Sequence, residues 1–121
     1  MIAKILVVDD DAVNRALLKD VLSYYGYEVL EAKDGREGIS MAREHMPQMI
    51  LMDTQMPVMD GVEAAKILKA DPRTKDIKII SLTGNIVNED SAESAGAGFD
   101  DYLSKPIDIR QLPNVMKKHL G

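Results

Sequence analysis

The stretch MILMDTQMPVMDG, residues 49–61, decides the fold that this chain is expected to adopt. Its apolar run, 49–52, is followed at once by Asp53 and then by a loop that contains a proline and ends in Asp-Gly. A short apolar run bounded by turn residues predicts a strand that is buried on both faces of a parallel sheet. Asp53 then stands at the carboxyl end of that strand, where open α/β sheets bind their ligands.

Similar patterns recur on both sides of this stretch. Further strands are predicted at KILVVD (4–9), EVLEA (28–32), IKIISL (77–82) and DDYLS (100–104), with EVLEA at an edge of the sheet. Helices are predicted between and after the strands, at 12–25, 34–45, 61–70, 88–96 and 108–120. Five strands that alternate with five helices predict the α/β class and a single doubly wound, five-stranded parallel sheet.

Capping and helix-breaking residues refine the bounds of these helices. Asp11 is suited to cap the first helix and Gly26 to end it. The helix at 88–96 lacks large apolar residues and contains Gly96, so we expect it to be the least stable element. Asp108 is suited to cap the last helix, but Pro113 falls within its first turns. This helix therefore either begins later than Asp108 suggests or bends at the proline.

The composition narrows the class of protein. The 121 residues suit one compact domain, and 45% hydrophobic with 29% charged residues is ordinary for a globular protein. No cysteine is present, which fits a reducing compartment, and we expect a cytoplasmic protein that does not span a membrane. The net charge of −5 and the scattered basic residues argue against nucleic acid as a direct partner.

Polar residues follow four of the predicted strands. In a parallel sheet, Asp9 and Asp10, Asp53, Thr83 and Lys105 all come to the same edge. Crowded carboxylates repel one another, and oxygen ligands without histidine or cysteine favour Mg²⁺. Lys105 and the Thr83 hydroxyl would then bind phosphate oxygens, and Asp53 is the candidate nucleophile. These residue types predict a site for phosphoryl transfer.

The chain resembles the receiver domains of two-component response regulators over essentially its whole length, residues 1–121. The motifs occur in order, from KILVVDDD through LMDTQMPVMDG and IISLTG to DDYLSKPI. The resemblance implies a flavodoxin-like fold with strand order 2-1-3-4-5. It implies that Asp53 accepts the phosphoryl group and that Asp10 binds Mg²⁺ directly. Asp9 matches a second acid, often acting through water, and Gln55 matches the residue whose backbone carbonyl binds the metal.

The resemblance also implies a mechanism of signalling. Thr83 and Lys105 match the phosphate-binding hydroxyl and lysine, and Tyr102 matches the aromatic residue that switches. A phosphohistidine on a sensor histidine kinase or a phosphotransfer protein would donate the phosphoryl group. Thr83 would then move inward and Tyr102 would rotate into the vacated space. The surface formed by the fourth helix, fifth strand and last helix would change, which would control a downstream protein target.

A few positions depart from the pattern of that family. Thr54 stands where an apolar β-branched residue is usual, and Gly84 where alanine is usual, although neither removes a group that the chemistry needs. Gln55 and Asn85 occupy the positions that tune hydrolysis of the aspartyl phosphate in the family. Both are amides that can orient a water but cannot take its proton, so they do not predict the lifetime of the phosphoryl group.

Two other functions are compatible with parts of this pattern. A phosphorylation-independent binding module usually lacks an acid, the threonine or the lysine, and all of these are present. A Mg²⁺-dependent hydrolase that works through an aspartyl phosphate usually has a second acid two residues after its nucleophile, where this chain has Gln55. The chain would catalyse its own phosphorylation and dephosphorylation without turning over an independent substrate. We expect either a stand-alone regulator without an output domain or a piece of a longer kinase or regulator.

Each candidate residue also has a plainer interpretation. The Asp9–Asp11 triplet could serve only to begin a helix, and Lys105 could be an exposed loop lysine. Tyr102 could be an ordinary core residue. His45 and His119 lie near helix ends without evident partners, so we expect both to be surface residues.

Overall fold

The computed structural model describes residues 2–53, 61–83, 99–104 and 107–120. Its strands are β1 (Lys4–Val8), β2 (Glu28–Ala32), β3 (Met49–Asp53), β4 (Lys78–Thr83) and β5 (Asp101–Ser104). Its helical elements are α1 (Ala12–Tyr24), α2 (Gly35–His45), α3 (Gly61–Ala70), the 3-10 turn η1 (Ile109–Gln111) and α5 (Leu112–Leu120). The elements expected within these residues are present, whereas the helix expected at 88–96 lies outside the described residues.

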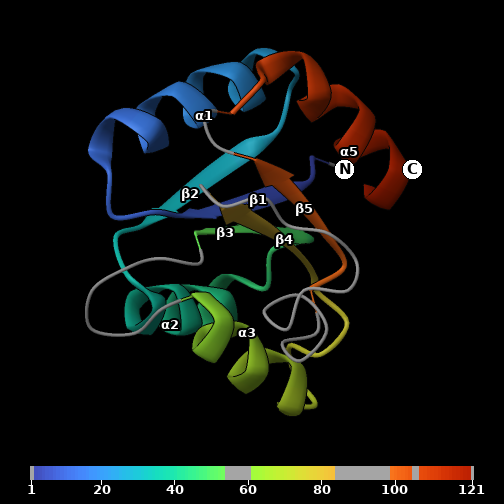
Figure 1. Cartoon of the computed structure of the whole chain (residues 1–121). Coiled ribbons are helices and arrows are strands. Elements are labelled where there is room, and N and C mark those ends of the chain that lie inside the picture. The colour runs from blue at the N-terminus through green and yellow to red at the C-terminus, as the bar shows by residue number, and fades with distance from the viewer. Residues whose placement is uncertain (1, 54–60, 84–98, 105–106, 121) are drawn as a thin grey trace.

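The strands form one parallel sheet in the order β2-β1-β3-β4-β5. This order confirms the expected doubly wound, flavodoxin-like sheet, and it places β2 at an edge as the EVLEA pattern predicts. Helices α1 and α5 cover one face of the sheet, and α2 and α3 cover the other (Figure 1). Because β1 and β3 lie at the centre, both of their faces are covered by helices.

The central strands supply two separate cores, because successive side chains of a strand point to opposite faces. Leu51 of β3 joins the cluster that contains Leu18 of α1 and Met116 of α5. Its neighbour Ile50 joins the other cluster, together with Leu68 of α3. All of these side chains are buried. The unbroken apolar run of β3 is therefore required by burial on both faces.

The ends of α1 follow the expected capping pattern. The Asp11 side chain accepts hydrogen bonds from the backbone N–H groups of Val13, at 2.9 Å, and Asn14, at 3.4 Å. Gly26 follows the helix with a φ of 93°, a left-handed conformation that favours glycine. The cap fixes the start of α1 directly after Asp9 and Asp10, which follow the end of β1.

The last helix begins later than Asp108, which settles the question raised by Pro113. The Asp108 carboxylate accepts a hydrogen bond from the backbone N–H of Arg110 at 3.0 Å and so caps η1. Helix α5 starts at Leu112, with Pro113 as its second residue. The first backbone N–H groups of a helix have no partner within the helix, so proline costs no hydrogen bond there.

An ionic contact joins α5 to the edge of the sheet. The Asp101 carboxylate of β5 lies 3.0 Å from His119 Nε2 and 3.3 Å from Lys118 Nζ, and it also accepts the backbone N–H of Tyr102. The expectation that His119 is a surface residue without a partner is wrong, because its side chain is 10% exposed. Residue 119 lies seven positions after Leu112, on the buried face of α5.

The same contact changes the ionisation of Asp101. Partial burial by itself would raise the pKa of this carboxyl group. Hydrogen bonds from His119, from the Tyr102 backbone and from Lys118 outweigh burial, and the pKa of Asp101 is lowered from its ordinary value of 3.8. The ionised form of Asp101 therefore stabilises the folded state.

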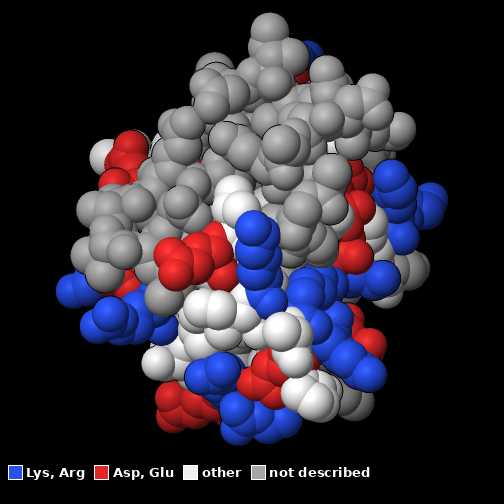
Figure 2. Space-filling view, turned by 60° about the horizontal axis from the view of Figure 1, so that its bottom comes forward, with Lys and Arg blue, Asp and Glu red and all other residues white. Residues whose placement is uncertain are grey.

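The surface carries both charges. On the face that Figure 2 shows, the described Lys and Arg side chains lie interspersed with Asp and Glu side chains. An ion pair joins α2 to the residue after α3, where Arg43 Nε lies 3.1 Å from Asp71 Oδ2. In the part of the chain that the structure describes, no helix has the length and apolar character needed to cross a membrane.

We expect Asp101→Asn to lower the free energy of unfolding by about 1–2 kcal/mol near neutral pH, because charge-assisted hydrogen bonds to α5 are lost. Because the pKa of Asp101 is lowered in the folded state, this stabilisation is fully present above about pH 3.8, the ordinary pKa of the group. It is lost as the pH falls below that value. Urea unfolding of the parent and the variant, from neutral pH to about pH 3, should show a difference that shrinks on acidification.

The matched control for this experiment is Asp20→Asn, which neutralises an exposed carboxylate on α1. It should leave stability close to the parent value across the same range. A difference between Asp101→Asn and the parent that stays constant with pH would contradict the proposed ionic contact.

Candidate functional site

The register of the two central strands brings Asp9 and Asp53 together. Val8 of β1 pairs with Met52 of β3, so the residues that follow them leave the sheet side by side. Asp9 is fully buried and Asp53 is 3% exposed, whereas Asp10 is exposed. Buried carboxylates at the carboxyl edge of a parallel sheet are unusual outside binding sites.

Three carboxylates converge at this edge. One oxygen from each of Asp9, Asp10 and Asp53 lies within 4.8 Å of the other two. Two unit charges about 4 Å apart repel by about 4 kcal/mol at an effective dielectric near 20. A bound cation removes that repulsion, and a set of oxygen donors without nitrogen or sulfur fits a hard divalent ion such as Mg²⁺. The three residues therefore have the chemistry of a Mg²⁺ site.

The turn that carries Asp9 and Asp10 is held from several sides. The backbone N–H of Asp9 donates to the Ala32 carbonyl of β2 at 3.1 Å. The Asp9 side chain accepts the backbone N–H of Asp11 at 2.9 Å, and the Asp9 carbonyl accepts a hydrogen bond from Arg15 Nη1 at 2.6 Å. Because strand β2 and helix α1 both contact this turn, its backbone is fixed before any ligand arrives.

A glycine packs directly on the backbone of Asp53. A Cβ atom at Gly61, the first residue of α3, would lie 2.0 Å from the Asp53 carbonyl oxygen and 2.8 Å from Met52 Cγ. No side chain fits at this position unless the end of β3 or the start of α3 moves. The sequence predicted Gly61 as the end of a loop and the first residue of a helix, but it did not predict the close approach of α3 to β3.

The remaining candidates are only partly described. Thr83 is the last residue of β4, next to Leu82, which pairs with Asp53, so its backbone lies at the same edge. Its side chain lies outside what the structure describes. Tyr102 lies in β5 and is partly buried. Gln55 and Lys105 lie outside the described residues.

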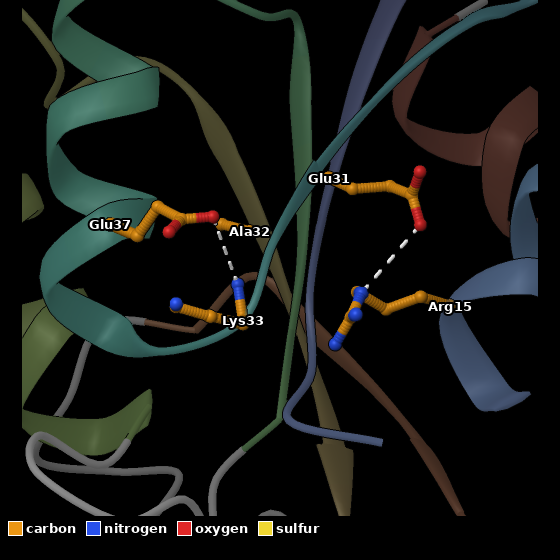
Figure 3. A pocket seen from close by; sticks show the side chains of 5 residues that line it. All are labelled: Arg15, Glu31, Ala32, Lys33 and Glu37. Carbon is orange, nitrogen blue, oxygen red and sulfur yellow. Dashed lines mark hydrogen bonds and ion pairs between the residues drawn. The ribbon is translucent and has the colours of Figure 1, made fainter. Parts of the chain in front are cut away.

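Arg15 is a feature of this edge that sequence analysis missed. Arg15 Nε lies 3.6 Å from Glu31 Oε1 of β2, and both residues line an open cavity of about 170 Å³ (Figure 3). The residues that line the cavity are Arg15, Glu31, Ala32, Lys33 and Glu37. Helical spacing places Arg15 on the same face as Leu18 and Leu22, which are buried. A charged residue on the buried face of a predicted helix is the pattern in the sequence that could have identified Arg15.

A family model and individual relatives both match this chain, and they indicate the same family. The family described as "Response regulator receiver domain" matches residues 5–117. The polar-differentiation response regulator DivK of Brucella ovis is 34% identical over 121 residues, which cover 100% of this chain and 98% of the relative.

Two solved structures have a similar fold. The receiver domain of the sensor histidine kinase PA1611 of Pseudomonas aeruginosa PAO1, with a magnesium ion coordinated in its active site cleft, superposes with a TM-score of 0.91 at 31% identity. The alignment covers 100% of this chain and 99% of that one. The receiver domain of Ssk1 of Saccharomyces cerevisiae, solved with the histidine phosphotransfer protein Ypd1, gives 0.89 at 26% identity, with 98% and 88% covered.

We expect Gly61→Ala to lower the free energy of unfolding by about 1–3 kcal/mol, because the added methyl group overlaps the Asp53 carbonyl. It should also weaken Mg²⁺ binding, because Asp53 must shift to make room. Urea unfolding and a Mg²⁺ titration followed by NMR measure the two effects.

Gly38→Ala is the matched control. Its added methyl group would lie 2.9 Å and 3.1 Å from the two methyl groups of Val8 and would not overlap a backbone carbonyl. We expect a smaller loss of stability and unchanged Mg²⁺ binding. Gly61→Ala with the stability and the Mg²⁺ affinity of the parent would contradict the close approach.

Proposed function

The chain belongs to the response regulator receiver domain family, and we propose that it is a phospho-acceptor switch that takes a phosphoryl group onto Asp53 in a Mg²⁺-dependent reaction. We propose that residues 1–121 form a single receiver domain. The observation that carries this proposal is the convergence of three carboxylates, with the nearly buried Asp53 among them. The chain contains no cysteine, which supports a reducing compartment such as the cytoplasm.

The carboxylates of Asp9, Asp10 and Asp53 would hold the metal ion, and the backbone carbonyl of Gln55 would complete the protein ligands. Bound Mg²⁺ supplies positive charge that offsets the carboxylates and the incoming phosphoryl group. The geometry of the three carboxylates supports their role as metal ligands. The role of Gln55 is proposed only from its position in the motif LMDTQMPVMDG.

The reaction is a transfer between two nucleophiles. A carboxylate oxygen of Asp53 attacks the phosphorus atom of a phosphohistidine, and the phosphorus–nitrogen bond breaks. The nitrogen keeps the electron pair, and the proton on the other ring nitrogen of the phosphohistidine lets the histidine leave as neutral imidazole. Lys105 would pair with one phosphoryl oxygen and the Thr83 hydroxyl would donate to another. The donor would be a sensor histidine kinase or a phosphotransfer protein, which is the kind of protein seen with the yeast receiver domain.

The output would be a change of surface that a downstream protein recognises. Thr83 is the last residue of β4. Tyr102 is partly buried and lies on the adjacent strand β5. A phosphoryl group on Asp53 would draw the Thr83 hydroxyl inward, and Tyr102 would rotate into the space. Because Asp101, the neighbour of Tyr102, is bound to α5, this change would alter the face formed by β5 and α5.

We expect the parent protein to gain one phosphoryl group from acetyl phosphate in the presence of Mg²⁺ and none when a chelator is added. Asp53→Asn should gain none under either condition, because an amide is not a nucleophile towards phosphorus. Intact mass spectrometry measures both results.

Asp11→Asn is the control for this test, since it neutralises the third acid of the triplet but preserves a good helix cap. It should be phosphorylated like the parent. Phosphorylation that persists in chelator, or in Asp53→Asn, would contradict the proposal.

We also expect beryllofluoride, a phosphoryl analogue, to change amide hydrogen exchange between residues 84 and 104 in the presence of Mg²⁺. Thr83→Ala should bind the analogue but lose most of this change at Tyr102, because the hydroxyl that transmits it is missing. Hydrogen exchange followed by mass spectrometry tests this mechanism. Identical exchange with and without the analogue in the parent would rule out the proposed switch.

A further inference from the structure

Arg15 joins the acidic turn to the neighbouring strand through two different contacts. Its Nη1 donates to the Asp9 carbonyl at 2.6 Å, and its Nε lies 3.6 Å from a carboxylate oxygen of Glu31. Figure 3 shows Arg15 and Glu31 pointing toward each other from α1 and β2. The Arg15 side chain is 19% exposed. A planar guanidinium group can make both contacts at once, whereas a lysine ammonium is a single point charge on a flexible chain.

The Asp9 carbonyl belongs to the peptide group that joins Asp9 to Asp10. A peptide group is planar, so a hydrogen bond to its oxygen fixes the orientation of the whole unit. That orientation determines the directions in which the two neighbouring carboxylates leave the backbone. Arg15 thus acts on both acids at once without touching either carboxylate through this bond.

We propose that Arg15 is a positioning residue for the divalent cation, holding Asp9 and Asp10 in the arrangement that binds it. This inference rests on the proposed function, in which these acids bind Mg²⁺. Arg15 holds the turn from the side of α1, while the Ala32 carbonyl holds the Asp9 N–H from the side of β2. Glu31, on the same strand, places a carboxylate oxygen 3.6 Å from the Nε atom of the guanidinium group.

Charge and positioning make opposite predictions for Arg15. The guanidinium group carries a positive charge beside the backbone of the acidic turn, so by Coulomb's law alone its removal should strengthen the binding of a cation. If Arg15 positions the turn, its removal should weaken binding, because the carboxylates no longer start in the required arrangement. The sign of the change in Mg²⁺ affinity therefore separates the two roles.

Lys19 provides a matched control on the same helix. Its Nζ lies 3.6 Å from the other carboxylate oxygen of Glu31, one turn further along α1 from Arg15. Lys19→Ala removes a positive charge and an ion pair with Glu31 but leaves the bond from Arg15 to the Asp9 carbonyl in place. It reports what the loss of charge near Glu31 does by itself.

The experiment is a Mg²⁺ titration of the parent, Arg15→Ala, Arg15→Lys and Lys19→Ala, followed by the amide NMR signals of residues 8–12. We expect Arg15→Ala to raise the dissociation constant for Mg²⁺ by roughly 10-fold, the usual effect of losing a group that orients metal ligands. Arg15→Lys should give an intermediate value, and Lys19→Ala should stay at or slightly below the parent value. Urea unfolding in chelator shows which variants are folded.

The possible outcomes separate this inference from the function on which it rests. A parent that does not bind Mg²⁺ overturns the proposed function, and the role of Arg15 falls with it. A parent that binds Mg²⁺ together with an Arg15→Ala variant that binds as tightly, or more tightly, overturns the role of Arg15 alone. Should Arg15→Ala fail to fold, Arg15→Lys decides, and parent-like affinity in that variant overturns the inference.

Discussion

Three carboxylates crowded at the end of two paired strands are the constraint on which the rest of the structure depends. The parallel register of β1 and β3 places Asp9 beside Asp53, and their burial strengthens their repulsion. The apolar cores on both faces of these strands must hold that arrangement in place without a bound cation. The strands are the most deeply buried elements of the fold, which explains how they tolerate acids at their ends. A divalent ion that binds between the carboxylates removes this repulsion, and the removal favours binding.

The groups around the acids fix the backbone that carries them. Gly61 lets α3 begin against the Asp53 carbonyl, and Asp11 caps α1 immediately after the acidic turn. Arg15 of α1 and the Ala32 carbonyl of β2 both form hydrogen bonds with the backbone of Asp9. These contacts are made by backbone atoms or reach backbone atoms, so the directions of the carboxylates are determined largely by the fold. A site that is built before its ligand arrives loses little entropy on binding.

The sheet could be predicted from the sequence because each strand is a short apolar run ended by polar or turn residues. Parallel pairing alone predicted that one edge of the sheet would carry Asp9, Asp10 and Asp53. The sequence did not predict the burial of His119, because its partner Asp101 is distant in sequence and its buried face follows from the spacing to Leu112 on α5. Arg15 and Gly61 were missed for a related reason. Their contacts join elements whose separation depends on how helices pack on the sheet, which residue patterns do not specify.

The most direct test of the central claim is to identify the residue that carries the phosphoryl group. The parent protein would be incubated with acetyl phosphate and Mg²⁺, reduced with borohydride, digested and analysed by tandem mass spectrometry. Borohydride converts an aspartyl phosphate to homoserine, so the modified residue is marked permanently. We predict homoserine at position 53 and nowhere else, and none when Mg²⁺ is withheld. Homoserine at another aspartate, or none at position 53 in a protein that has gained a phosphoryl group, would contradict the account.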